Sequence, residues 1–120
     1  MTAAAPVAIV DDDESLRNAL ARLFRAAGYS VEAFASALEL LSSLSTRRPH
    51  CVILDLQLPA MSGVELLQRL AHLDNPPAVL VITGSDDARM RDRCMALGAK
   101  GYFRKPVDGD ALLEAVRELT

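Results

Sequence analysis

Aspartate residues follow two of the apolar runs in this sequence. Asp11 and Asp12 come directly after the apolar residues 6–10, and Asp55 comes directly after residues 51–54. A carboxylate beside a hydrophobic core is costly to keep charged, and crowded carboxylates raise one another's pKa unless a cation joins them. Mg²⁺ suits such a group because it binds a few carboxylate oxygens and keeps several waters; Mn²⁺ is an alternative. An aspartate beside such an ion can attack phosphorus and form an acyl phosphate, which makes Asp55 a candidate nucleophile.

A hydroxyl and an ammonium group follow two further apolar runs. Thr83 and Gly84 end one of these runs, and Lys105 follows residues 100–103. Thr83 could donate its hydroxyl to a phosphoryl oxygen, whereas Gly84 would leave the approach open and supply a backbone amide. Lys105 could stabilise the negative charge of a transferred group. If these residues lie together, they favour phosphoryl transfer to Asp55.

Each of these residues also has a simple structural explanation. An acid before residues 14–20 can cap a helix, and Asp13 is the acid expected to do so. Asp55 could bond to backbone amides in a turn, Thr83 could simply end a strand, and Lys105 could be a solvated surface lysine. Chemistry is favoured because unrelated causes would otherwise have to bring three acids, a hydroxyl and a lysine to one place.

Short apolar runs alternate with longer amphipathic patterns along the chain. The apolar runs predict five strands, at residues 6–10, 30–34, 51–54, 78–83 and 100–103. The amphipathic patterns predict five helices, at residues 14–28, 36–44, 64–73, 87–99 and 108–119, with Ser36 and Asp108 as caps. This alternation predicts a doubly wound α/β domain, in which a parallel sheet is covered by helices on both faces. Ligands bind such sheets beyond the carboxyl ends of the strands, where the residues above are expected.

The composition is typical of one soluble globular domain, residues 1–120. Apolar residues make up 51% of the chain and charged residues 24%, and the net charge of −3 predicts no direct binding to nucleic acid. Cys51 and Cys94 lack metal-ligand spacing and are interpreted as buried free thiols, which suits the cytoplasm. The first residues have no basic start and no long apolar stretch, so neither a signal peptide nor a membrane span is predicted.

Four segments together resemble the receiver domain of bacterial response regulators, and the resemblance covers essentially the whole chain. In sequence order they are "IVDDDESL", "VILDLQLPAMSG", "VLVITG" and "GAKGYFRKP". Pro59 and Gly63 lie four and eight residues after Asp55, a spacing that matches the family. The resemblance implies a flavodoxin-like (βα)5 three-layer sandwich with strand order 2-1-3-4-5. It also implies a cis peptide bond between Lys105 and Pro106.

The resemblance assigns the metal site and the phosphorylation site to named residues. It implies that Asp55 accepts the phosphoryl group. Mg²⁺ would be bound by Asp11, Asp12, the Asp55 carboxylate and the backbone carbonyl of Gln57.

Contacts with the phosphoryl group are implied for Thr83, Gly84 and Lys105. Thr83 would move toward the phosphate, and Tyr102 would exchange between outward and inward rotamers as the switch aromatic. The simpler explanation of Tyr102 is an ordinary half-buried tyrosine in a strand.

Two-component signal transduction is the function that the resemblance implies. A sensor histidine kinase or a histidine phosphotransfer protein would donate the phosphoryl group, and the domain would catalyse its own phosphorylation and slow autodephosphorylation without being a classical turnover enzyme. The surface of the fourth helix, fifth strand and fifth helix would then control a partner or an attached output domain, or form a phosphorylation-dependent homodimer. Basic residues cluster in this region: Arg89, Arg91, Arg93, Lys100 and Arg104.

Three other functions compete with this interpretation. A receiver-like interaction module that is never phosphorylated would keep the same acids for a metal or a partner. A phosphohydrolase of the haloacid dehalogenase type would need a second aspartate two residues after Asp55, where this sequence has Gln57. A flavin or nucleotide binder would need a glycine-rich first loop, where this sequence has three acids.

Overall fold

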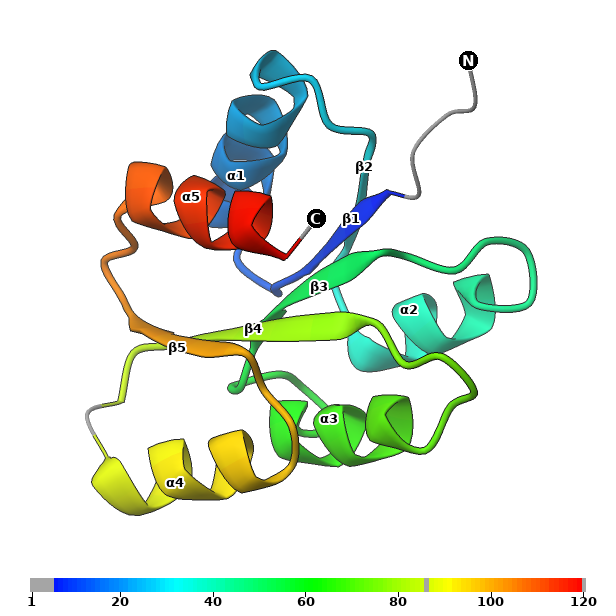
Figure 1. Cartoon of the computed structure of the whole chain (residues 1–120), viewed down its shortest axis with the longest axis vertical. Coiled ribbons are helices and arrows are strands. Elements are labelled where there is room, and N and C mark those ends of the chain that lie inside the picture. Colours follow the sequence, from blue (N-terminus) through cyan, green and yellow to red (C-terminus); the bar gives the residue numbers. More distant parts are fainter. Residues whose placement is uncertain (1–5, 86, 120) are drawn as a thin grey trace.

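Strands and helices alternate along the whole of the described chain, and the helices lie on both sides of the sheet (Figure 1). The computed structural model describes residues 6–85 and 87–119. The strands are β1 (Val7–Val10), β2 (Val31–Phe34), β3 (Cys51–Asp55), β4 (Ala78–Thr83) and β5 (Gly101–Arg104). The helices are α1 (Glu14–Ala26), α2 (Ala37–Ser43), α3 (Gly63–Ala71), α4 (Ala88–Ala96) and α5 (Gly109–Glu118).

The sheet is parallel throughout, with strand order β2-β1-β3-β4-β5, which confirms the predicted fold. The chain passes from β1 to β2 on one side and then returns to place β3 on the other side of β1. Such a reversal opens a crevice at the carboxyl ends of the two strands. Val10, the last residue of β1, pairs with Leu54 of β3, so the next residues, Asp11 and Asp55, emerge at the same level.

Alternate side chains of each strand enter two separate hydrophobic cores. Val7 and Ile9 of β1 pack on the face covered by α1 and α5, whereas Ala8 and Val10 pack on the face covered by α2, α3 and α4. Figure 1 shows the same division of the helices. Because the inner strands are buried on both faces, they appear in the sequence as continuous apolar runs.

The two cysteines are buried free thiols, as predicted. Burial raises the pKa of the Cys51 thiol to about 12 and also raises the pKa of the Cys94 thiol. Both therefore remain protonated at neutral pH and pack as small apolar side chains.

The predicted element boundaries agree with the structure to within a few residues. The side chains of Asp13, Ser36 and Asp108 each accept backbone hydrogen bonds from the first helical turn, which confirms the three predicted caps. Each helix ends one to three residues earlier than predicted. At α1 and α4 the end is set by Gly28 and Gly98, which adopt φ angles of 97° and 106° just beyond these helices. That left-handed conformation stops a helix and is easily reached by glycine.

Gly63 lets α3 begin directly against the chain that leaves β3. Its backbone N–H donates to the carbonyl of Leu56 at 3.0 Å. A Cβ atom at Gly63 would lie 2.5 Å from the Leu56 Cα and 2.6 Å from the Asp55 carbonyl oxygen. Only glycine fits this close to the backbone of Leu56 and Asp55, which gives a steric reason for a glycine eight residues after Asp55.

We predict that Gly63→Ala lowers the free energy of unfolding by about 1–3 kcal/mol, because the backbone must move to admit the methyl group. Urea denaturation would measure the change. Gly84→Ala is the matched control, since the nearest atom to a Cβ there is the Gln57 Oε1 at 3.9 Å. Equal stability of the Gly63→Ala variant and the wild type would contradict the steric explanation.

Candidate functional site

Three aspartates meet at the carboxyl edge of the sheet. One carboxylate oxygen from each of Asp11, Asp12 and Asp55 lies within 4.8 Å of the other two. Asp11 and Asp55 are 0% and 2% exposed, whereas Asp12 is open to solvent. The structure thus brings together the acids that the sequence places more than forty residues apart.

The ammonium group of Lys105 contacts two of these acids. Its Nζ is 3.2 Å from Oδ2 of Asp11 and 3.2 Å from Oδ2 of Asp55. The backbone N–H of Lys105 donates to the Thr83 carbonyl at 2.7 Å, which ties the lysine to the end of β4. The Lys105–Pro106 peptide bond is cis, as the sequence resemblance implied.

Burial and neighbouring charges shift the pKa values of Asp55 and Lys105. Burial raises the pKa of the Asp55 carboxyl and the Asp11 carboxylate adds to the rise, while a hydrogen bond from the Gln57 amide and the charge of Lys105 oppose it only in part. Burial by itself would lower the pKa of Lys105, but attraction to Asp55 and Asp11 outweighs burial, so this pKa is raised. The single ammonium group of Lys105 therefore contacts two buried carboxylates, so the negative groups of the site outnumber the positive one.

The oxygen atoms of this acidic site fit a hard divalent cation. Oδ2 of Asp11 is buried and accepts no hydrogen bond from the described residues, and its contact with Lys105 is an ion pair. Oδ1 of Asp55 accepts from the Gln57 amide at 3.0 Å. Carboxylate oxygens of this kind, with the exposed Asp12 as the side open to water, suit Mg²⁺. The contribution of the Gln57 carbonyl stays a prediction.

Thr83 lies at the end of β4, with its side chain buried. Its hydroxyl oxygen accepts a hydrogen bond from the Ser85 N–H at 3.1 Å. Its own hydroxyl hydrogen therefore remains able to donate to another oxygen. Gly84 is exposed beside it, and a Cβ at Gly84 would meet open space on most sides.

Comparison with known proteins decides the family. The family model of the response regulator receiver domain matches residues 7–117. The chain belongs to the response regulator receiver family. Members of this family act in two-component signal transduction, and the acidic site described above lies at the residues that the sequence resemblance singled out.

Curated relatives of this receiver domain include longer regulatory proteins. Nodulation protein W of Bradyrhizobium diazoefficiens is 40% identical over 92% of this chain and 48% of the relative. The transcriptional regulatory protein FixJ of Azorhizobium caulinodans is 36% identical over 93% of this chain and 53% of the relative. The chain thus spans about half the length of these relatives.

Solved structures confirm the same fold. A receiver domain protein from Methanospirillum hungatei superimposes with a TM-score of 0.89 at 30% identity, covering 95% of this chain and 91% of that one. A response regulator protein from Burkholderia pseudomallei, described with a phosphorylated aspartic acid and a calcium ion, gives a TM-score of 0.85 at 27% identity, with 93% and 66% covered.

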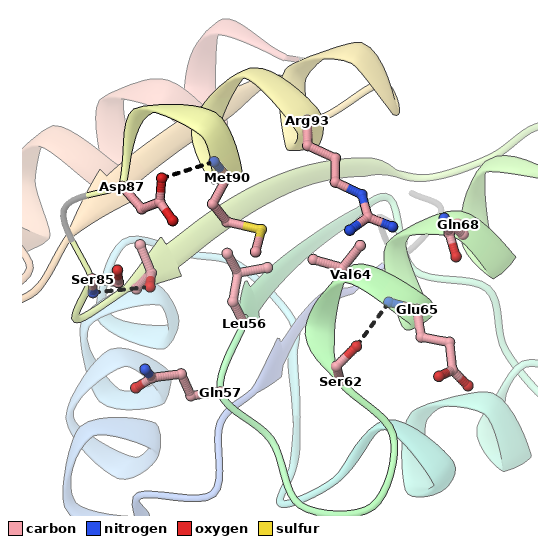
Figure 2. A pocket seen from close by; sticks show the side chains of 11 residues that line it. Leu56, Gln57, Ser62, Val64, Glu65, Gln68, Ser85, Asp87, Met90 and Arg93 are labelled. Atoms are coloured by element: carbon pink, nitrogen blue, oxygen red, sulfur yellow. Dashed lines mark hydrogen bonds between the residues drawn. The ribbon is translucent and has the colours of Figure 1, made fainter.

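A cavity of about 390 Å³ opens in the receiver domain between α3 and α4 (Figure 2). Apolar side chains of Leu56, Val64 and Met90 line it, and Gln57 and Thr83 line it as well. Thr83 therefore lies at the wall of a cavity as well as beside the acidic site.

Tyr102 lies in β5 with its side chain half-buried. It lines a second cavity of about 290 Å³ together with Ser85, Arg91 and Arg104. The hydroxyl oxygen of Tyr102 is buried, and the exchange between rotamers stays a prediction. The basic residues Arg89, Arg91, Arg93, Lys100 and Arg104 are all exposed.

No helix within residues 6–85 and 87–119 is both long enough and apolar enough to cross a membrane.

The sequence did not indicate one contact of the acidic site. Arg17 of α1 donates from Nη1 to the backbone carbonyl of Asp11 at 2.9 Å. In the sequence, Arg17 looks like any solvated arginine of an amphipathic helix.

Proposed function

We propose that this receiver domain, taken as residues 1–120, accepts a phosphoryl group on Asp55 from the phosphohistidine of a sensor histidine kinase or a histidine phosphotransfer protein. The observation that carries the proposal is the pairing of a buried aspartate at a strand end with a lysine and two further acids. An Asp55 oxygen forms the new bond to phosphorus while the bond from phosphorus to the donor imidazole nitrogen breaks. The nitrogen keeps the electron pair of that bond.

Mg²⁺, or Mn²⁺ in its place, would be held by Asp11, Asp12, Asp55 and the backbone carbonyl of Gln57. The ion would offset the negative charge of the phosphoryl oxygens during transfer. The phosphorylated aspartic acid and the calcium ion in the Burkholderia pseudomallei protein support this proposal for a related chain.

Protein side chains take up the added charge after transfer. Phosphorylation adds roughly two negative charges and three strong acceptor oxygens. Lys105 would exchange its contact with the Asp55 carboxylate for a phosphoryl oxygen. Thr83 would donate its hydroxyl hydrogen and Gly84 its backbone N–H to the same group, while water slowly hydrolyses the acyl phosphate.

The signal would reach the surface of α4, β5 and α5 through Thr83 and Tyr102. Thr83 and Tyr102 line different cavities, but Ser85 lines both. Because the Ser85 N–H donates to the Thr83 hydroxyl, a shift of Thr83 would move Ser85 beside Tyr102. That surface would then bind an output domain, a partner protein or a second phosphorylated copy. The cytoplasm is the compartment in which such kinases act on their receivers.

The test is the intact mass of the protein after incubation with Mg²⁺ and acetyl phosphate. We expect wild type to gain one phosphoryl group, Asp55→Asn to gain none, and EDTA to abolish the gain. An unlabelled wild type that still binds Mg²⁺ would instead favour the interaction module that is never phosphorylated.

A further inference from the structure

Arg17 connects the body of α1 to the residue that leaves β1. Its Nη1 donates to the backbone carbonyl of Asp11 at 2.9 Å, and the contact is partly buried. Two local bonds shape the same turn: the Asp13 N–H donates to Oδ1 of Asp11 at 2.9 Å, and Oδ1 of Asp13 accepts from the N–H of Ser15 at 3.0 Å. Arg17 adds the bond that spans six residues and fixes this turn to the helix.

The position of this bond matters because Asp11 and Asp12 belong to the same turn. Rotation of the Asp11 peptide would move the Asp11 carbonyl and would also redirect the backbone on which the Asp12 side chain is mounted. A guanidinium group donating to a carbonyl makes a stronger and more directional bond than a neutral donor does.

We infer that Arg17 is a positioning residue for the metal side of the site, holding Asp11 and Asp12 in a binding geometry before a cation arrives. The inference rests on the proposed function, because it assumes that these acids bind Mg²⁺. Arg17 touches neither the cation nor the phosphoryl donor. Partners that orient metal ligands in this way commonly change metal affinity by about 10- to 100-fold when they are removed.

Simple electrostatics predicts the opposite change in Mg²⁺ affinity. Arg17 is a cation close to an acidic site, so its removal alone would strengthen the attraction of Mg²⁺ to the carboxylates. A weaker affinity in the variant would therefore have to come from lost positioning. The direction of the change distinguishes the two causes.

The experiment measures the Mg²⁺ dissociation constant by calorimetry for wild type, Arg17→Met, Arg17→Lys and Arg22→Met. We expect the constant to rise about tenfold for Arg17→Met and to be partly restored in Arg17→Lys, which can still donate to the carbonyl. Arg22→Met is the matched control, because Arg22 is exposed on the same helix and makes no hydrogen bond or ion pair with the described residues. Its constant should equal that of wild type.

A second measurement separates positioning from a direct role. The rate of labelling by acetyl phosphate should require more Mg²⁺ in Arg17→Met, yet reach the wild-type maximum when Mg²⁺ is saturating. A lower maximum would mean that Arg17 contacts the donor, and would overturn the inference. Thermal melting without Mg²⁺ shows whether Arg17→Met has lost stability. If it has, the Mg²⁺ affinity of Arg17→Lys is compared with that of wild type instead.

Binding and labelling fail in different ways. If wild type binds Mg²⁺ but takes no phosphoryl group, the proposed function fails while the binding data still test Arg17. An unchanged or tighter constant in Arg17→Met overturns the inference and leaves the proposed function intact. If wild type binds no Mg²⁺, both are overturned.

Discussion

Lys105→Met is expected to lower the free energy of unfolding by about 3 kcal/mol at pH 7 in buffer that contains EDTA. The substitution leaves Asp11 and Asp55 buried without the cation that contacts both of them at 3.2 Å. Breaking a buried ion pair from one side costs about 3–5 kcal/mol, and the lower end applies because the Lys105 side chain is 26% exposed. Urea denaturation measures the loss directly.

The pH range follows from the raised pKa of Lys105 in the folded state. A group whose folded pKa is raised stabilises the fold fully below its ordinary pKa and loses this effect as the pH rises through the folded value. The ordinary value is 10.5, so the full effect of Lys105 is present at neutral pH.

Two controls make the Lys105 result specific. Adding Asp55→Asn to Lys105→Met should recover much of the lost stability, because one of the two uncompensated charges is removed. Lys100→Met should change stability little, since Lys100 is exposed. A loss that Asp55→Asn does not relieve would mean that the cost comes from packing rather than charge.

Asp55→Asn is expected to stabilise the metal-free protein by about 1–2 kcal/mol at pH 7. Burial raises the pKa of the Asp55 carboxyl above the ordinary 3.8, so there is a pH range just above 3.8 in which the folded protein keeps a proton that the unfolded chain has lost. Between the ordinary and the raised pKa, stability therefore falls as the pH rises. Ionised Asp55 destabilises the fold at neutral pH, and the neutral amide removes that cost.

The difference in free energy of unfolding between the Asn variant and wild type should shrink as the pH is lowered toward 4, because protonation makes the wild-type carboxyl neutral like the amide. Thermal melting across pH 4–8 with EDTA measures it. Asp12→Asn serves as the control at an exposed acid of the same site. A stability difference that does not vary with pH would show that ionisation of Asp55 is not its cause.

The order of the elements was predictable because the chain has a simple physical pattern. Strands buried on both faces require continuous apolar runs, and the helices between them require one apolar side, so the alternation itself indicates a doubly wound sheet. Asp13, Ser36 and Asp108 could be recognised as caps because each is a short polar residue before an amphipathic stretch. Gly28 and Gly98 indicated where α1 and α4 end, but both helices stop before these glycines, because a residue with a positive φ lies outside the helix.

The acidic site was predictable for a different reason. In a parallel sheet the residues after each strand reach one edge, so Asp11, Asp55, Thr83 and Lys105 could be grouped from their positions alone. The pattern could not show which groups contact each other. In the structure Lys105 pairs with Asp11 as well as Asp55, and the Thr83 hydroxyl oxygen accepts a hydrogen bond from the Ser85 amide. Arg17 was missed because its partner is a backbone carbonyl, which leaves no trace in the sequence.

Reductive trapping tests the phosphorylation of Asp55 in the protein without any substitution. Borohydride converts an acyl phosphate to an alcohol with release of phosphate, so a phosphorylated aspartate becomes homoserine. The protein would be treated with Mg²⁺ and acetyl phosphate, reduced, digested and analysed by peptide mass spectrometry. We predict homoserine at position 55; homoserine at position 11 or 12 instead, or none in protein that binds Mg²⁺, would contradict the account.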